Sequence, residues 1–131
     1  MFRELKSEDY INYLILLKQL NNMDITISKE EFIQEYQLMK QTNSVIYVYE
    51  KYNKILATAK LLYEVKFYDN IVHIEDVVVD SNFRNIGLGK KMIQYIIDIS
   101  PPNYKIVLQG DNEFYEKCGF TIEGKNYCKR N

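Results

Sequence analysis

The chain has 131 residues, of which 47% are hydrophobic and 27% are charged, and its formal net charge is −1. This length and composition predict one folded domain over residues 1–131, and the near-neutral charge argues against nucleic acid as a partner. No apolar run approaches the ~18 residues needed to span a bilayer, and the first residues do not resemble a secretory signal. We therefore expect a cytoplasmic protein that does not bind membranes.

The N-terminal third is predicted to contain one short strand and two helices. Phe2 to Leu5 forms the strand, and Ser7 is expected to cap a first helix that runs from Glu8 to Leu20. After a loop, Ser28 and Glu31 form a capping-box pattern at the start of a second helix. Apolar residues at helical spacing predict that each helix buries one face against a sheet.

The middle of the chain is predicted to alternate between strands and turns. Residues 45–49 and 55–65 are rich in β-branched and aromatic residues and are separated by a turn-like tetrad, which predicts an antiparallel hairpin. Residues 71–79 form the next predicted strand. A helix is expected from Lys91 to Ile99, with Leu88 on the same apolar face, and it must end before Pro101 because proline cannot continue a helix.

The C-terminal part is predicted to hold a strand over 104–108, a short helix over 112–117 and one or two strands between Phe120 and Cys128. Since a helix connects the strands at 71–79 and 104–108, these two strands would be parallel if they belong to one sheet. The order of elements therefore predicts a mixed α/β fold, of the α+β type, with one core.

The loop before the central helix carries a functional signal. Arg84, Gly87 and Gly89 form the pattern R-x-x-G-x-G at a helix N-terminus, where free backbone N–H groups and the macrodipole favour an anion such as a pyrophosphate. The pattern alone is weak, because it lacks the third glycine of a dinucleotide fingerprint and a tight turn would also explain it. Lys90 at a helix start is better explained by a phosphate contact than by capping.

The two cysteines and the single histidine of the chain form neither a metal-binding pattern nor a disulfide framework. Cys118 would be a difficult nucleophile to activate, because the chain has no second histidine. We expect structural roles for Cys118 and Cys128, and no metal ion.

Three further motifs follow one another in a fixed order. They are His73-Ile74-Glu75-Asp76-Val77, Tyr104-Lys105-Ile106-Val107-Leu108 and Phe114-Tyr115-Glu116-Lys117-Cys118-Gly119-Phe120. Together with the glycine loop they resemble the glucosamine 6-phosphate N-acetyltransferases, a family of the GCN5-related N-acetyltransferase (GNAT) superfamily, and the similarity extends over nearly the whole chain. The resemblance implies a single acyl-CoA N-acyltransferase domain. Its mixed central sheet, flanked by about four helices, would hold acetyl-CoA between two splayed parallel strands.

The resemblance also implies a reaction. The acetyl group of acetyl-CoA would pass directly, in a ternary complex, to the 2-amino group of D-glucosamine 6-phosphate, on the way to UDP-N-acetylglucosamine. Tyr115 would hydrogen-bond or protonate the departing thiolate, and the backbone around Val77 and Val78 is the candidate that stabilises the oxyanion. Asp76 and Asp111 would position the amine. Because neighbouring strand residues point to opposite faces, Glu75 and Asp76 are not expected to act as a carboxylate pair.

Two sets of binding residues follow from the same resemblance. The set for acetyl-CoA comprises Val77, Val78, Val79, Arg84, Asn85, Ile86, Gly87, Leu88, Gly89, Lys90, Asn112, Tyr115 and Lys117. The set for the amino sugar phosphate comprises Asn21, Lys66, His73, Glu75, Asp76, Tyr104, Lys105 and Arg130. The family pattern also implies a homodimer, in which the terminal strand crosses to the partner subunit and Arg130 completes the partner's site.

Two other functions remain open. The chain could acetylate another amine, such as a polyamine, an antibiotic or a protein lysine, or it could be an acyl-CoA-binding module without turnover. The basic residues Lys66, Lys105 and Arg130 favour a phosphorylated acceptor. Tyr115, in combination with the E-D-V strand, favours an enzyme.

Overall fold

The computed structural model describes residues 1–20, 24–109, 113–124 and 126–131. In chain order the elements are β1 (Phe2–Glu4), the 3-10 turn η1 (Ser7–Asp9), α1 (Tyr10–Leu17), α2 (Lys29–Gln41), β2 (Ser44–Lys51), β3 (Lys54–Val65), β4 (Asn70–Val79), the 3-10 turn η2 (Ser81–Phe83), α3 (Leu88–Ile99), β5 (Lys105–Gln109), α4 (Phe114–Lys117), β6 (Thr121–Glu123) and β7 (Asn126–Arg130). Within these described ranges, no helix is long and apolar enough to cross a bilayer.

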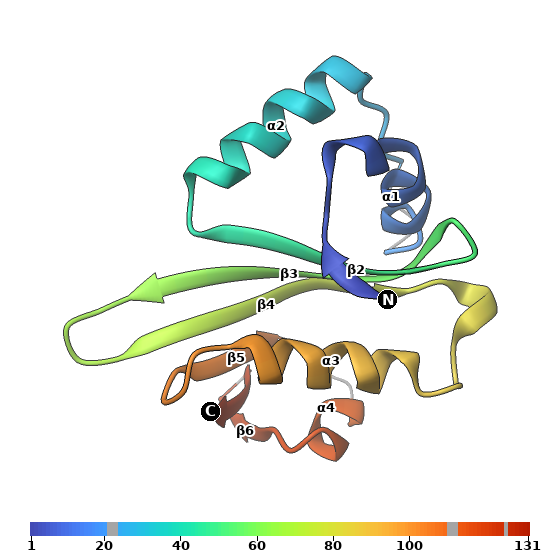
Figure 1. The fold of residues 1–131 in the computed structure, drawn as a ribbon. Helices are drawn as coiled ribbons and strands as arrows, with labels where there is room; N and C mark the ends of the chain where they lie inside the picture. Colours follow the sequence, from blue (N-terminus) through green and yellow to red (C-terminus); the bar gives the residue numbers. More distant parts are fainter. Residues whose placement is uncertain (21–23, 110–112, 125) are drawn as a thin grey trace.

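The described strands form one seven-stranded sheet in the order β1-β2-β3-β4-β5-β7-β6. Neighbouring strands are antiparallel except β4 and β5, which are parallel. Helices α1 and α2 lie on one face of the sheet, and α3 and α4 lie on the other (Figure 1). The mixed sheet with helices on both faces confirms the predicted fold class.

Each face of the sheet carries its own cluster of buried side chains. The larger cluster lies under α3, where Met92, Ile93 and Ile96 pack against the sheet residues Leu61 and Ile106, all with no exposed surface. The second cluster lies under α1 and α2 and contains Leu16, Phe32 and Val48, among others. The apolar stripe of α3 therefore faces the sheet, as expected from burial of nonpolar surface. The stripes predicted on α1 and α2 are only partly right, because Ile11, Ile15 and Leu38 are exposed.

The start of the first helix differs from the prediction. Helix α1 spans Tyr10–Leu17 and is shorter than the expected segment from Glu8 to Leu20. The carboxylate of Asp9, not the hydroxyl of Ser7, holds this start: it accepts a hydrogen bond from the backbone N–H of Lys6 at 2.8 Å and pairs with Arg3 at 2.8 Å. The long-range pair with Arg3 is not encoded in the local sequence.

The start of the second helix follows the prediction. The Oγ of Ser28 accepts a hydrogen bond from the backbone N–H of Glu31 at 3.1 Å, and its hydroxyl lies 3.2 Å from the carboxylate of the same residue. This cap satisfies one of the N–H groups that a helix N-terminus leaves without an intrahelical partner.

The predicted hairpin of β2 and β3 is confirmed, and its turn is strained. Tyr52 and Asn53 have φ angles of 56° and 57°, so both lie in the left-handed region that a two-residue hairpin turn of the primed type needs. Asparagine tolerates this conformation, whereas a residue such as tyrosine is destabilised by roughly 1–2 kcal/mol.

The parallel strands β4 and β5 part after four residues. Their register runs from Ile71 opposite Lys105 to Ile74 opposite Leu108, and β4 continues to Val79 without a further β5 partner among the described residues. Pairing therefore ends one residue before β5 itself ends at Gln109, as expected if the two parallel strands diverge here.

Strand β4 is also irregular where it leaves β5. Glu75 lies opposite Lys60 and Val78 lies opposite Thr58, so Asp76 and Val77 together face the single residue Ala59. Asp76 has a φ angle of 53°. An extra residue on one strand is a β-bulge, which bends the strand and redirects its side chains.

Candidate active site

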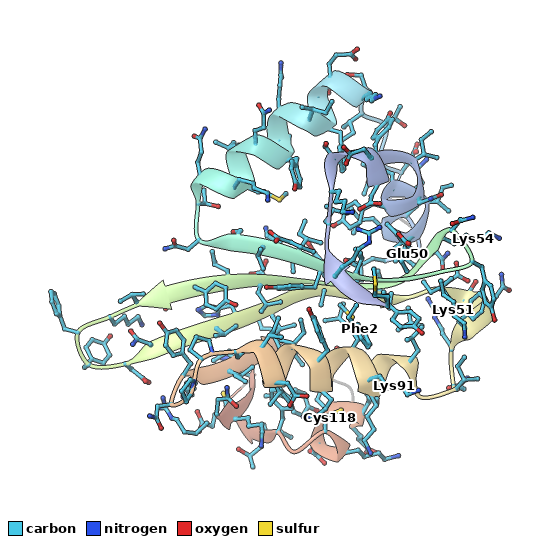
Figure 2. All side chains as sticks on the ribbon, viewed as in Figure 1. Phe2, Glu50, Lys51, Lys54, Lys91 and Cys118 are labelled. Atoms are coloured by element: carbon cyan, nitrogen blue, oxygen red, sulfur yellow. The ribbon has the colours of Figure 1, made fainter. Side chains whose placement is uncertain are left out.

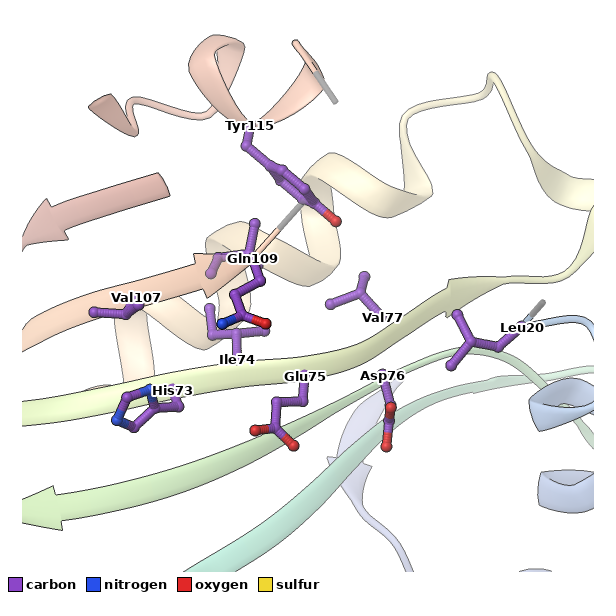
Figure 3. Close-up of a pocket in the computed structure, with 10 residues that line it drawn as sticks. Leu20, His73, Ile74, Glu75, Asp76, Val77, Val107, Gln109 and Tyr115 are labelled. Atoms are coloured by element: carbon purple, nitrogen blue, oxygen red, sulfur yellow. The ribbon is translucent and has the colours of Figure 1, made fainter. Parts of the chain in front are cut away.

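A pocket of about 470 Å³ opens where β4 and β5 part (Figure 3). We call it the strand-gap pocket. It is lined by Leu20, His73, Ile74, Glu75, Asp76, Val77, Val107, Leu108, Gln109 and Tyr115. The two acids and the histidine make one side of this pocket polar, which suits a hydrophilic ligand that carries an amine.

A second pocket, of about 670 Å³, lies beside the glycine loop, and we call it the loop cleft. It is lined by Gln19, Leu20, Val77, Val78, Val79, Arg84, Asn85, Gly87, Gly89, Lys90, Phe114 and Tyr115. The charged residues in this lining are the cations Arg84 and Lys90, so the cleft suits an anionic ligand.

The strand-gap pocket and the loop cleft meet. Leu20, Val77 and Tyr115 line both of them. Two ligands bound in the two pockets would therefore touch beside the bulge of β4 on one side and the phenol of Tyr115 on the other. Such an arrangement permits a group to pass from one ligand to the other without a covalent enzyme intermediate.

Tyr115 is held over the junction by other aromatic rings. Its ring centroid lies 5.5 Å from that of Phe114 and 5.4 Å from that of Tyr127, in edge-to-face geometry. Figure 3 shows its side chain reaching from α4 toward the gap between the strands. Burial, with smaller contributions from Cys118 and Tyr127, raises the pKa of Tyr115 above its ordinary value. The phenol is therefore protonated at neutral pH and can donate a hydrogen bond.

The bulge of β4 supplies the other side of the junction. Neither Asp76 nor Val77 has a register partner of its own in β3. Main-chain groups released from a ladder at a bulge can bind a ligand instead of a neighbouring strand. The backbone at Val77 therefore lies beside the junction without a ladder partner of its own in β3, and its oxyanion-binding role stays a prediction.

The expectation that Glu75 and Asp76 lie on opposite faces is wrong. Figure 3 shows both side chains projecting to the same side of β4. The reason is the bulge: the left-handed conformation of Asp76 breaks the alternation that a regular strand imposes. On this side Asp76 lies close to Tyr13 of α1. Burial raises the pKa of Tyr13, and the negative charge of the Asp76 carboxylate raises it further. Two carboxylates therefore lie in one part of the strand-gap pocket.

The glycines of the loop have specific structural reasons. Gly87 precedes α3 with a φ angle of 85°, in the left-handed region that glycine adopts at no steric cost. A Cβ added to Gly89 would lie 3.4 Å from the ring of Phe114 and 3.6 Å from Val79, so this position packs closely against the cleft wall. The Nε of Arg84 donates to the carbonyl of Val79 at 3.0 Å, which holds its guanidinium beside the cleft.

Most residues predicted to bind acetyl-CoA line the loop cleft. They are Val77, Val78, Val79, Arg84, Asn85, Gly87, Gly89, Lys90 and Tyr115. Ile86 and Leu88 do not, because alternate loop residues point away from the cleft into another pocket. Lys117 is exposed and lines neither the cleft nor the strand-gap pocket. Asn112 lies outside the described residues.

The residues predicted to bind the acceptor divide into two groups. His73, Glu75 and Asp76 line the strand-gap pocket. Lys66 does not line it but is linked to its edge, because one carboxylate oxygen of Glu64 lies 3.4 Å from the Nζ of Lys66 and 3.4 Å from the Nε2 of His73. The pKa of Glu64 is lowered, by the hydrogen bond from His73 first and by Lys66 to a smaller extent.

The remaining acceptor residues are engaged elsewhere. The Nζ of Lys105 lies 2.6 Å from a carboxylate oxygen of Glu123, and Tyr104 packs edge-on against Tyr63. The guanidinium of Arg130 makes two hydrogen bonds, of 2.7 and 3.2 Å, to the carboxylate of Asp69. Asn21 and Asp111, also singled out by the sequence, lie outside the described residues.

Seven residues that line the two pockets are absent from the predicted binding and catalytic sets: Gln19, Leu20, Ile74, Val107, Leu108, Gln109 and Phe114. Phe114 adjoins Tyr115 within the last motif, so the motif itself was an available signal. Gln19 has no local signal, because its role depends on contacts across the fold. Its side-chain oxygen accepts from the backbone N–H of Ser81 at 2.8 Å and its amide donates to Asp80 at 3.2 Å.

The thiols of the chain behave as structural groups. Burial raises the pKa of Cys118, although the charge of Lys90 opposes this change. Burial, followed by contact with Glu123, also raises the pKa of Cys128. A raised pKa disfavours the reactive thiolate. Among the described residues, no three His, Cys, Asp or Glu side chains group in a way that could hold a metal ion.

The sequence of this chain is similar to those of known proteins. The family model of the acetyltransferase (GNAT) domain matches residues 42–122. The glucosamine 6-phosphate N-acetyltransferase 1 of Dictyostelium discoideum is 37% identical over 136 residues, covering 94% of this chain and 85% of that protein.

Solved structures show the same fold. The crystal structure of the glucosamine-6-phosphate N-acetyltransferase from Arabidopsis thaliana superposes with a TM-score of 0.84 at 34% identity, over 95% of this chain and 92% of that one. A predicted acetyltransferase from Clostridium acetobutylicum, solved with acetyl-CoA, has a TM-score of 0.69 at 17% identity, over 95% of this chain and 92% of that one. At this identity, the second likeness concerns the fold alone.

Proposed function

We propose that this chain, which belongs to the acetyltransferase (GNAT) family and to the glucosamine 6-phosphate N-acetyltransferases within it, transfers the acetyl group of acetyl-CoA to the 2-amino group of D-glucosamine 6-phosphate. The products are coenzyme A and N-acetyl-D-glucosamine 6-phosphate. The whole chain, residues 1–131, acts as one catalytic domain. The observation that carries the proposal is the meeting of the strand-gap pocket with the loop cleft at Val77 and Tyr115.

The amine attacks the thioester directly. Acetyl-CoA occupies the loop cleft and the amino sugar occupies the strand-gap pocket, so the two reactants are held in contact. The nitrogen lone pair forms the C–N bond, the C–S bond breaks, and the electron pair of that bond leaves with sulfur. The nitrogen loses one proton to a carboxylate or to water, and the sulfur gains one. No cysteine of the chain is needed as a nucleophile.

The backbone of the β4 bulge stabilises the transition state. Negative charge develops on the carbonyl oxygen of the acetyl group as the amine attacks, and the N–H of Val77 is the candidate donor to it. The N–H of the adjacent Val78 is a second candidate. A fixed backbone dipole does not need to reorganise when charge appears, and one such donor typically contributes about 10²–10³-fold in rate.

Tyr115 protonates or hydrogen-bonds the departing sulfur. Its raised pKa keeps the hydroxyl protonated over the pH range in which the acceptor amine is reactive. Water then restores the proton that the phenol has given up. This assignment follows from the position of the ring at the junction of both pockets.

Glu75 and Asp76 orient the sugar and its amine. Both line the strand-gap pocket on the same side of β4 (Figure 3), so they form a paired acidic surface toward an ammonium group. The carboxylates attract the charged amine, and one of them accepts the proton that it must lose before attack. Asp111 stays a prediction as a third acid near the amine.

The phosphate of the acceptor binds at the His73 end of the strand-gap pocket. Glu64 holds His73 and Lys66 together through one carboxylate oxygen. A phosphate dianion would receive hydrogen bonds from these two side chains. Asn21, Tyr104 and Lys105 stay predictions for the same subsite.

We also infer a homodimer in which β7 contributes to the partner's site. Within one chain, β7 pairs with β5 from Arg130 opposite Lys105 to Asn126 opposite Gln109. Exchange of β7 between two identical copies would retain the same pairs, because each copy offers the same β5 edge. Arg130 would then leave Asp69 of its own chain and take the equivalent position in the partner subunit, at the edge of the partner's acceptor site.

A mixing experiment tests the shared site. Arg130→Ala and Tyr115→Phe each impair a homodimer, but a mixed dimer has one site with both residues intact. Mixing the two impaired variants should raise activity well above that of either variant alone if sites are shared. A monomer in analytical ultracentrifugation, or no recovery after subunit exchange has been verified, would contradict the inference.

We infer that the protein works in the cytoplasm. Cys118 and Cys128 are both free thiols, which suits a reducing compartment. Subcellular fractionation of the producing cell tests this: recovery in the cytosolic fraction is expected, and recovery with secreted proteins would contradict it.

An acceptor panel tests the proposed reaction. Glucosamine 6-phosphate, glucosamine, glucosamine 1-phosphate and a lysine peptide are compared at equal concentration, with release of coenzyme A thiol as the readout. Glucosamine 6-phosphate should give the highest kcat/KM, and Tyr115→Phe should reduce its rate. A preference for the peptide would overturn the acceptor assignment, and the absence of thiol release with every acceptor would favour a binding module.

A further inference from the structure

A smaller cavity, of about 200 Å³, lies across the glycine loop from the loop cleft. It is formed between the tip of the β2–β3 hairpin and the start of α3, and we call it the hairpin pocket. Tyr49, Tyr52 and Phe83 line it together with Lys51 and Lys91. Figure 2 shows Lys51 at the hairpin tip above Lys91 on α3. The proposed reaction uses none of these five residues.

The lining of the hairpin pocket has a uniform charge. Its charged residues are the lysines Lys51 and Lys91, and its other residues are aromatic or aliphatic. The Nζ of Lys51 lies 5.1 Å from the ring centroid of Tyr52, a cation–π contact, and Tyr52 as a residue is 68% exposed. A flat ring with a cation beside it can stack on an aromatic base and neutralise its phosphate at the same time.

We propose that the hairpin pocket binds a nucleoside diphosphate. The base stacks on Tyr52 and Phe83, inside the aromatic part of the cavity, and the phosphates lie outward between Lys51 and Lys91. Inorganic phosphate alone would use the lysines but not the rings, so the aromatic lining favours the nucleotide. The unusual backbone of Tyr52, with its φ angle of 56°, directs this exposed ring at the hairpin tip.

The hairpin pocket shares a wall with the loop cleft. Asn85, Gly87 and Gly89 line the cleft, whereas the intervening Ile86 and Leu88 line the hairpin pocket. Two polyphosphates on opposite sides of this short loop repel each other at low salt. Binding of the nucleotide therefore raises the KM for acetyl-CoA and, because coupling is reciprocal, acetyl-CoA weakens the nucleotide. This coupling rests on the proposed function, whereas nucleotide binding itself does not.

Calorimetry with guanosine diphosphate tests the site. Coenzyme A is kept at saturation in one arm so that the loop cleft is filled. The variants are Lys51→Glu, Tyr52→Gly and the control Lys54→Glu, which makes the same charge change on the hairpin at a residue outside the pocket. Tyr52→Gly removes the ring and also relieves the left-handed strain, so it should fold at least as well as the wild type.

Guanosine diphosphate should still bind the wild type at saturating coenzyme A. Its affinity should decrease about tenfold or more in Lys51→Glu and Tyr52→Gly, and should change less than about twofold in Lys54→Glu. Inorganic pyrophosphate should bind about tenfold more weakly than guanosine diphosphate. Equal losses in all three variants would indicate unspecific attraction and overturn the proposal. The proposal would also be overturned if the wild type did not bind guanosine diphosphate, or if pyrophosphate bound with the same affinity as the nucleotide. Binding of the nucleotide that coenzyme A abolishes and that Lys51→Glu does not change would overturn it as well. None of these outcomes depends on acetyl transfer.

Discussion

Replacement of Tyr115 by phenylalanine is expected to slow the chemical step and leave the fold intact. The change removes one hydroxyl and keeps the ring, whose centroid lies 5.5 Å from Phe114 and 5.4 Å from Tyr127. Loss of a half-buried hydroxyl should change the free energy of unfolding by no more than about 1 kcal/mol. A decrease in rate can therefore be assigned to chemistry and not to unfolding.

The size of the decrease follows from the acidity of the two groups. A positioned proton donor contributes about 10²–10⁴-fold. Burial raises the pKa of Tyr115 above its ordinary value of about 10, while a free thiol has a pKa of about 8.5. The phenol is thus a weak acid toward a good leaving group, and it acts mainly through its hydrogen bond. We expect kcat to fall about 10²-fold, at the lower end of the range, with KM for acetyl-CoA nearly unchanged.

Thiol release at saturating concentrations of both substrates is the assay, supported by a single-turnover measurement that confirms that chemistry limits the rate. The protonated phenol is the active form, so wild-type activity should be retained up to the raised pKa of Tyr115 and decrease above it. The variant should lack this alkaline decrease. The free energy of unfolding should change with pH in the same direction as activity, because burial disfavours the charged tyrosinate. The contribution of Tyr115 to stability is complete below pH ~10 and is lost at higher pH. A variant within twofold of wild-type kcat would refute the assignment.

Three other substitutions test the loop, the core and a helix cap. Gly87→Asp adds bulk and negative charge where φ is 85° and should abolish acetyl-CoA binding in calorimetry. The control Gly87→Asn tolerates that backbone conformation and should bind acetyl-CoA within about tenfold of the wild-type affinity. Equal losses of affinity in the two variants would contradict the charge argument. Met92 is fully buried, so Met92→Ala should reduce the free energy of unfolding by about 2–5 kcal/mol, measured by unfolding in urea. A loss below about 1 kcal/mol would be inconsistent with the core described. Ser28→Ala should cost about 1 kcal/mol in the same assay, and an unchanged midpoint would show that the hydrogen bond to Glu31 contributes little.

Features encoded by local sequence were predicted well. The hairpin of β2 and β3, the cap of α2 at Ser28 and the existence of the central helix α3 each depend on turn, cap or periodicity signals within a few residues. The glycine loop and Tyr115 lie where the motifs indicated, and both line the loop cleft. These parts of the candidate site were accessible because strand, loop and helix follow one another without interruption.

The bulge at Asp76 was not predicted, although it decides the geometry of the site. It arises from the register between β3 and β4, in which Asp76 and Val77 together oppose Ala59. No residue type in Glu75-Asp76-Val77 requires an extra position, so the sequence implied regular alternation and opposite faces. Only the pairing of two strands over a distance reveals that the two acids share a side.

Long-range ion pairs were also beyond sequence reasoning. Arg130 was singled out as a substrate ligand, yet within the chain it pairs with Asp69 at 2.7 Å. Arg3 fixes Asp9, and that contact changes where the first helix begins. Such pairs join residues far apart in the chain, and their partners depend on the packed fold and not on a local pattern.

A crystal structure of the ternary complex with coenzyme A and N-acetyl-D-glucosamine 6-phosphate would show whether the two reactants meet at Tyr115 and Val77. We expect the sulfur within hydrogen-bond distance of the Tyr115 hydroxyl and the acetyl oxygen directed at the backbone N–H of Val77, with the sugar beside Glu75 and Asp76. A coenzyme bound away from the gap between β4 and β5, or a sugar on the far side of the sheet from His73, would contradict this expectation.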